Sequence, residues 1–126
     1  MLRVRVETPC RPTEDIEKVT TAVRSLFPDV QLIAEPEGRV VGTTESVEHL
    51  REQIRNQRIR DTARRQLLGV RHGNRTTVTL SKQAAFMGIV NFAASSPLGD
   101  VVVEIESDAL DAVIDYVAES TVKAHS

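Results

Sequence analysis

Arginine side chains are concentrated in one stretch of the chain, which begins at Arg51 and ends at Arg75. It holds eight arginines and two acidic residues, whereas the rest holds 8 basic and 16 acidic residues, so its formal charge is about +6 against about −8 elsewhere. Guanidinium keeps its charge and can bind two phosphate oxygens at once, so the stretch predicts a surface that binds oxyanions. The candidate contacts are Arg51, Arg55, Arg58, Arg60, Arg64, Arg65, Arg71 and Arg75.

Lys82 is a further candidate, because it follows Ser81 at the start of a short predicted helix. A cation in the first turn of a helix opposes the helix dipole, so Lys82 beside free N–H groups would fit an anion-binding spot. The alternative is that Lys82 ends the preceding strand and points into water.

The partner of the cationic stretch is predicted to be nucleic acid or the acidic face of another protein, because like charges repel one another unless an anion compensates them. Only Glu52 and Asp61 lie within the stretch to neutralise it. The alternative is a solvated helix whose arginine stems cover apolar surface. Aromatic residues make up 3% of the chain and its phenylalanines stand in apolar contexts, so recognition of folded RNA or a duplex through backbone and shape is favoured over base stacking.

Residues that could support catalysis form no recognisable site. His49, His72 and His125 are scattered, with no cysteine or carboxylate at metal-ligand spacing. The six glycines match neither a phosphate-binding loop nor the dinucleotide pattern. Cys10 is the only cysteine and has no neighbouring histidine, so it is predicted to be a structural thiol. We expect no enzyme activity, no metal and no cofactor.

The first part of the chain predicts one helix and three strands. Residues 2–6 alternate apolar and charged side chains, which indicates a strand with one buried face. Thr13 is a candidate N-cap for a helix over residues 14–27. Two apolar runs at 30–34 and 39–42, separated by a turn sequence, predict paired strands.

The arginine stretch falls on a long helix that Ser46 is predicted to cap. Its apolar positions change phase, because Ile59, Ala63, Leu67 and Val70 are rotated by roughly half a turn from Val47, Leu50 and Ile54. One straight surface helix cannot bury both sets. We infer a kink or break near Asn56 and Gln57, although the sequence leaves a continuous helix open.

The rest predicts a strand at 76–81, short helical turns ending at Gly88, a short strand at 89–92, a turn at 95–99 and a buried strand at 101–106. Ser107 is expected to cap a last helix, and the tail 119–126 to fray. The succession predicts one α+β domain over residues 1–126, a mixed sheet with about three helices on one face. The chain lacks a long apolar run, so we expect a cytoplasmic protein without a signal peptide or membrane span.

Several segments resemble an uncharacterised archaeal family predicted to bind RNA and linked by genome context to the exosome and translation. The matching segments are RPTEDIEKVTTAVRSLFPD (11–29), RIRDTARRQLL (58–68), LSKQAAFMGIVNF (80–92) and PLGDVVVEI (97–105). The resemblance implies a fold like that of ribosomal protein L-five. It covers Arg58, Arg60, Asp61, Arg64, Arg65, Lys82, Gln83 and Asn91. The chain departs from the family at Ser81 and Ile89, where members often have Asn and Lys.

The predicted function is therefore non-catalytic binding of structured RNA, with arginines on the phosphate backbone and Lys82 with Gln83 as a second contact. The resemblance implies a place in an RNA-processing or translation complex. A scaffold whose basic helix docks an acidic protein is the main alternative, and a hydrolase or nucleotide-binding enzyme is the third.

Overall fold

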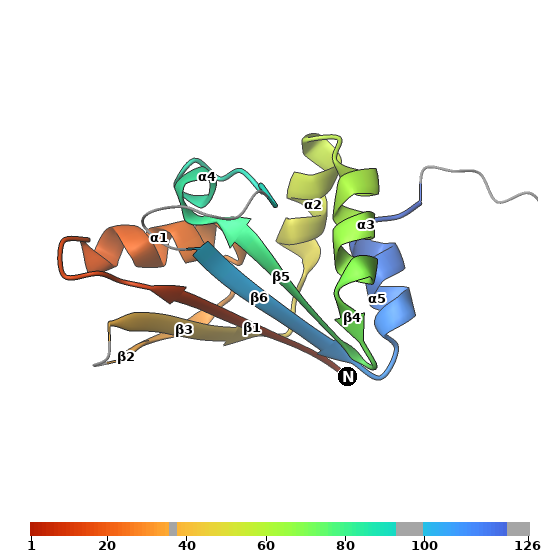
Figure 1. Cartoon of the computed structure of the whole chain (residues 1–126), viewed down its shortest axis with the longest axis horizontal. Coiled ribbons are helices and arrows are strands. Elements are labelled where there is room, and N and C mark those ends of the chain that lie inside the picture. The colour runs from red at the N-terminus through yellow and green to blue at the C-terminus, as the bar shows by residue number, and fades with distance from the viewer. Residues whose placement is uncertain (36–37, 93–99, 121–126) are drawn as a thin grey trace, which may run out of the picture.

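A single antiparallel sheet organises the molecule. The computed structural model describes residues 1–35, 38–92 and 100–120, with only the backbone of Ala34 and Glu35. In these residues six strands are arranged in the order β2-β3-β1-β6-β5-β4 (Figure 1). The strands are β1 (Leu2–Pro9), β2 (Gln31–Glu35), β3 (Arg39–Thr44), β4 (Arg71–His72), β5 (Arg75–Ser81) and β6 (Asp100–Ser107).

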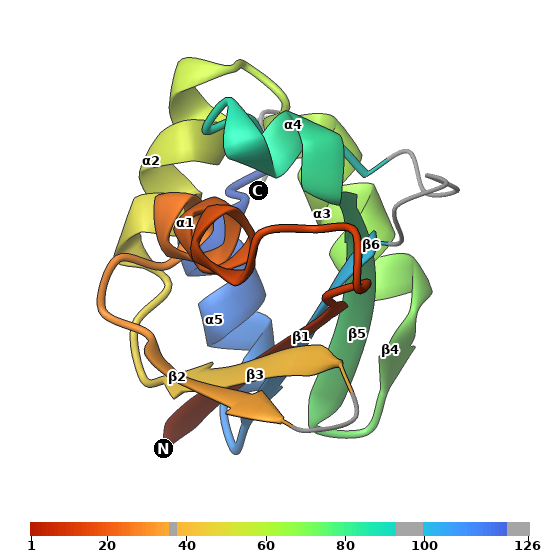
Figure 2. The same ribbon diagram turned by 90° about the vertical axis from the view of Figure 1, so that its left-hand side faces the viewer.

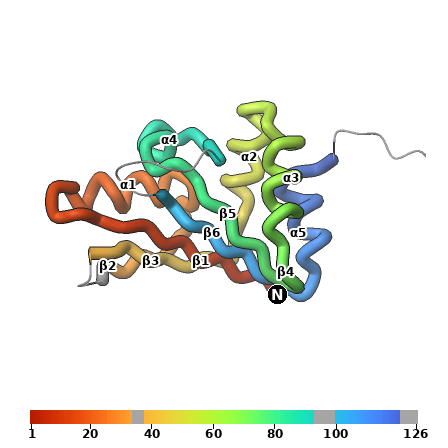
Figure 3. Tube along the Cα trace, in the orientation of Figure 1, coloured from red at the N-terminus to blue at the C-terminus, as the bar shows by residue number. Residues whose placement is uncertain are grey.

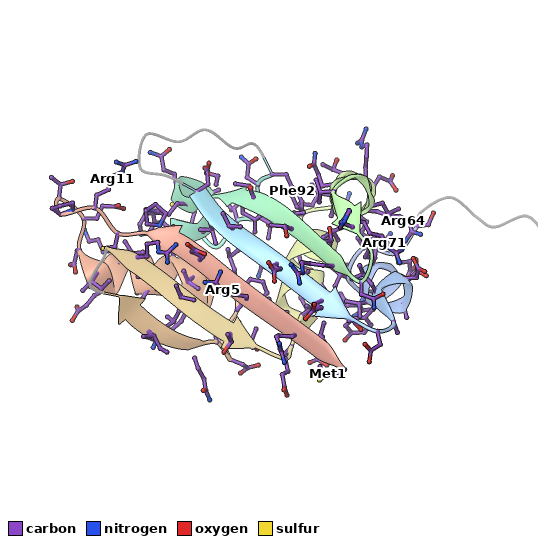
Figure 4. All side chains as sticks on the ribbon, turned by 60° about the horizontal axis from the view of Figure 1, so that its bottom comes forward. Met1, Arg5, Arg11, Arg64, Arg71 and Phe92 are labelled. Carbon is purple, nitrogen blue, oxygen red and sulfur yellow. The ribbon has the colours of Figure 1, made fainter. Side chains whose placement is uncertain are left out.

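Five helices in the described part of the chain cover one face of this sheet, and the other face is open (Figures 1 and 2). They are α1 (Ile16–Leu26), α2 (Glu48–Asn56), α3 (Arg60–Gly69), α4 (Lys82–Phe86) and α5 (Leu110–Val117). Alternation along the strands produces the two faces: Val4 and Val6 of β1 are fully buried, whereas Arg5 between them lies on the open face (Figure 4).

The predicted α+β class is confirmed, and every strand pairing described is antiparallel where a mixed sheet was expected. The strands predicted at 2–6, 30–34, 39–42, 76–81 and 101–106 are all present. Strand β4 was missed because it has only two residues, joined to β5 by a turn with Gly73 at φ +63°. No strand forms at 89–92, where the chain instead follows α4 and is held by side-chain contacts. The turn predicted at 95–99 and most of the tail, 121–126, lie outside the described residues.

Three helix caps differ from the predicted ones. Asp15, not Thr13, caps α1, and its carboxylate accepts the amide of Glu17 at 3.0 Å. Ser46 and Ser107 accept the amides of residues two positions later, at 3.3 and 3.1 Å, so each forms a local turn just before its helix. The cap positions of α2 and α5 are Val47 and Ala109. None of the helices that the structure describes has the length and apolar character needed to cross a membrane.

Candidate nucleic-acid interface

The arginine-rich stretch forms two helices, α2 and α3, joined by a tight turn (Figure 3). The predicted break is therefore confirmed. At the end of α2 the amide of Ile59 donates to the carbonyl of Ile54 and that of Arg58 to Arg55, both at 3.1 Å, which is the Schellman arrangement. Leu50 and Ile54 are buried before the turn, and Ala63 and Leu67 after it. The break lets both apolar phases face the same core.

Arg58 occupies the left-handed position of this turn, with φ +59°, and is the only described residue other than glycine with a positive φ. The position usually holds glycine, because a Cβ there costs about 1–2 kcal/mol. The turn therefore has an exposed arginine at a backbone position that disfavours any residue with a Cβ. Such local strain is a reason to suspect a functional role for the side chain.

Replacing Arg58 with glycine is expected to raise the free energy of unfolding by about 0.5–1 kcal/mol, because the relieved strain exceeds the extra freedom glycine gives the unfolded chain. Urea denaturation measures this. The matched control is Arg58→Ala, which removes the same charge but keeps a Cβ in the left-handed region. If glycine and alanine give equal stability, the turn carries no strain.

Three arginines of the stretch are paired with acidic residues of α5 and of the segment just after it, and α5 lies beside α3 (Figure 1). Arg60 lies 3.5 Å from Glu119, and Arg64 lies 2.5 Å from Asp115. The third pair joins Arg71 to Asp111; Figure 4 shows Arg64 and Arg71 at this end of the molecule. Glu52 and Asp61 are the only acids within the stretch, but these three carboxylates from outside it compensate part of its charge.

Asp111 and Asp115 are four residues apart on α5, so they share one face of the helix, and Glu119 follows four residues later, beyond the end of α5. This spacing is visible in the sequence, but the pairing of the acids with the arginines depends on how α3 and α5 pack. Their alignment forms a ladder of ion pairs, each partly exposed to solvent.

Two more of the predicted arginines are engaged within the protein. Arg51 donates from Nε to the carbonyl of Tyr116 at 2.9 Å, and its guanidinium carbon lies 4.7 Å from the centre of that ring. Arg75 lies 3.3 Å from Glu106 and 3.7 Å from Glu104 across the open face of the sheet. Both guanidinium groups therefore already have protein partners.

Arg55, Arg58 and Arg65 remain, and all are exposed. None of them forms an ion pair or side-chain hydrogen bond within the described part of the chain. Arg55 and Arg58 line one open surface depression at the turn, together with Arg60 and Asp61. Of the eight candidate arginines, these three have no ionic partner among the described residues; Arg55 and Arg58 lie at the α2–α3 turn and Arg65 lies on α3.

Lys82 does not reach the surface. Its side chain is fully buried, and its Nζ donates to the carbonyl of Pro9 at 2.7 Å and to both carboxylate oxygens of Glu14 at 3.1 Å. This corrects both readings of the sequence, a surface phosphate contact and a cation pointing into water. Glu14 precedes α1 and is far from Lys82 in the sequence, so no local pattern reveals the pair. Gln83, the neighbouring candidate, is exposed on α4.

The Glu14 carboxyl titrates below its ordinary range. Burial raises its pKa, but the hydrogen bond from the Arg11 amide and the hydrogen bond and charge of Lys82 outweigh burial and leave the pKa lowered. The side chain of Glu14 is only 9% exposed. The ion pair therefore joins the start of α4 to the loop before α1 as a structural element.

The chain that follows α4 is joined to the α2–α3 turn. Gln57, the last residue before Arg58, donates from Nε2 to the carbonyl of Val90 and accepts the Val90 amide at Oε1, both at 2.8 Å. Helix α4 ends in the same arrangement as α2, with Gly88 at φ +71° and the amide of Ile89 bonded to Ala84. Figures 1 and 2 both show α4 and the α2–α3 turn at the top of the molecule.

Comparison with known proteins identifies the family. A family model described as RNA binding matches residues 3–108. A UPF0201 protein of Methanothermobacter thermautotrophicus is 42% identical over 121 residues, which cover 94% of this chain and 92% of that protein. The chain belongs to the archaeal UPF0201 family. The resemblance seen in the sequence, to an archaeal family associated with RNA binding, is confirmed.

Other UPF0201 members share the fold. The crystal structure of the UPF0201 protein from Methanococcus jannaschii superposes with a TM-score of 0.86 at 35% identity, over 92% of this chain and 98% of that one. A UPF0200/UPF0201 protein of Archaeoglobus fulgidus is 36% identical over 124 residues, which cover 95% of this chain. This chain spans only 38% of the length of that relative. None of these three is named for an enzymatic activity.

The residues matched by the RNA-binding model contain both the paired and the unpaired arginines of the cationic stretch. Residues 3–108 include α2, α3, α4 and every arginine of the cationic stretch. The acidic partners lie after the matched residues: Asp111 and Asp115 are on α5, and Glu119 follows the end of that helix.

Proposed function

We propose that this protein binds structured RNA without catalysing a reaction, and that Arg55, Arg58 and Arg65 grip the phosphate backbone. The observation that carries the proposal is that these three guanidinium groups are exposed and have no ionic partner in the described residues, whereas five others of the same stretch are engaged. An unpaired cationic cluster favours an anionic partner. The RNA-binding description of the family model supports RNA as that anion.

The geometry of the turn favours RNA whose phosphates already have fixed positions. Arg58 is held by the Schellman hydrogen bonds and Gln57 by its two bonds to Val90, so the cations project from a rigid segment. A rigid array loses little entropy when it meets a preformed helical backbone. Arg60 and Arg64 on α3 add contacts only by exchanging the carboxylates of Glu119 and Asp115 for phosphates.

The test is a triple charge reversal, Arg55→Glu, Arg58→Glu and Arg65→Glu. Binding of a labelled RNA hairpin and of an unstructured RNA is measured by fluorescence anisotropy across a salt series. Three phosphate contacts to a duplex contribute about −2.7 to the slope of log affinity against log salt, so the variant is expected to lose that slope and at least about tenfold in affinity at low salt.

The matched control is Arg3→Glu, Lys18→Glu and Arg24→Glu. It changes the net charge equally at exposed cations of β1 and α1, away from the α2–α3 turn. Hairpin binding that survives in the control and fails in the test variant supports the site. An equal loss of RNA affinity in both variants would mean that net charge, and not these three arginines, causes the effect. Absence of RNA binding by the wild-type protein at low salt would reject RNA as the partner.

A further inference from the structure

An exposed apolar patch lies at the end of α4. Met87 is 76% exposed, Ile89 44% and Phe86 37%, so three large apolar side chains within four consecutive residues face solvent. The sequence had suggested that the phenylalanines were all in apolar surroundings. Phe27 is indeed buried, but the exposure of Phe86 corrects that view. Contiguous apolar side chains at a helix end stabilise the fold little and commonly mark a binding surface.

The segment that carries this patch is joined to the α2–α3 turn by two hydrogen bonds. Ile89 precedes Val90 and Arg58 follows Gln57, so each lies one residue from the two hydrogen bonds that join these segments at 2.8 Å. Both segments leave their helices through Schellman turns, with Arg58 and Gly88 at the left-handed positions. The apolar residues after α4 and the arginine at the α2–α3 turn therefore flank the same pair of hydrogen bonds between the two segments.

We propose that Phe86, Met87 and Ile89 receive an unpaired base of the RNA whose phosphates the α2–α3 turn holds. The inference rests on the proposed function and specifies its substrate class, a stem interrupted by a bulged nucleotide. A nucleotide has an anionic phosphate, which complements the arginines, and a base whose flat face is apolar, which complements Phe86, Met87 and Ile89. Unpaired bases in RNA can be splayed out and stacked on protein side chains, whereas bases within a stem cannot.

The experiment compares two labelled hairpins that differ only by one bulged nucleotide in the stem, at one salt concentration. Stacking of a base on an aromatic side chain such as Phe86 contributes roughly 1–3 kcal/mol, so wild-type protein is expected to bind the bulged hairpin about tenfold more tightly. Met87→Ser with Ile89→Ser is expected to bind both hairpins equally, with the affinity for the uninterrupted stem unchanged. Phe86→Leu keeps an apolar side chain but removes the ring, and is expected to reduce the preference.

Ile33→Ser is the matched control, since Ile33 is 69% exposed on β2, across the molecule from α4 (Figure 2). It is expected to keep the full preference. A wild-type protein that binds both hairpins equally, or a preference that persists in both patch variants, overturns the inference while leaving phosphate binding intact. Loss of binding to both hairpins in the triple arginine variant tests the proposed function, and it says nothing about the role of the patch.

Discussion

Lys82→Met is expected to lower the free energy of unfolding by about 3 kcal/mol, because it leaves the Glu14 carboxylate without its cation in a site that is 9% exposed. Breaking a buried pair costs about 3–5 kcal/mol, and the remaining hydrogen bond from the Arg11 amide places this case near the lower limit. The Pro9 carbonyl also loses its donor. Chemical denaturation of the wild type and the variant at neutral pH measures the difference.

The Glu14–Lys82 ion pair also makes the free energy of unfolding depend on pH. The folded-state pKa of Glu14 lies below its ordinary value of 4.5, so its contribution is fully present above about that pH and is lost as the pH falls through the lowered pKa. In Lys82→Met the pKa of Glu14 is expected to rise, because burial then acts without the opposing cation. The wild type should therefore lose more stability than the variant between neutral pH and the acid range.

Lys82→Met combined with Glu14→Gln is the control, because it removes both charges and should recover part of the loss. A loss below about 1 kcal/mol in the single variant would mean that the pair behaves like an exposed ion pair. RNA affinity, measured where the variant is still folded, is expected to be unchanged. Weaker RNA binding by the folded variant would instead restore Lys82 as a ligand contact.

Removing the acids of α5 is expected to tighten RNA binding. Asp111→Asn, Asp115→Asn and Glu119→Gln together free Arg71, Arg64 and Arg60 from their ionic partners. Three added phosphate contacts would make the salt slope steeper by up to about 2.7 and the affinity at low salt about tenfold higher. Hairpin binding across a salt series measures both.

The comparison variant carries Glu17→Gln, Asp29→Asn and Glu45→Gln, which removes three negative charges from exposed acids of other elements. Exposed ion pairs contribute little, so both variants should remain folded. Equal tightening in the two would assign the effect to net charge. An unchanged slope in the α5 variant would exclude the α3 arginines from the interface.

Local patterns in the sequence predicted most of the fold. Alternation identified β1 and β6, and the shift in apolar phase between Ile54 and Ala63 revealed the break between α2 and α3. The left-handed backbone of Arg58 could not be predicted, because arginine carries no preference for that conformation. Strand β4 is too short to produce a periodic signal.

The site was predicted less well, because charge compensation is a property of tertiary structure. The segment 51–75 was correctly recognised as cationic, but Arg64 finds Asp115 at a separation of 51 residues and Lys82 finds Glu14 at 68. A count of charges within a segment cannot include such partners. The packing of α5 beside α3 and of β5 beside β6 separates the engaged arginines from Arg55, Arg58 and Arg65.

The central place of β6 in the sheet governs the order in which the chain can fold during synthesis. β6 lies between β1 and β5, although it comes last along the chain among the described strands. Until it leaves the ribosome, β1 and β5 each present an unpaired edge, and the sheet exists as two separate parts. Helix α5 follows β6, so the arginines of α3 are also made before the carboxylates that neutralise them. The arginines of α3 in a nascent chain thus lack these ionic partners until Asp115 and Glu119 have been synthesised.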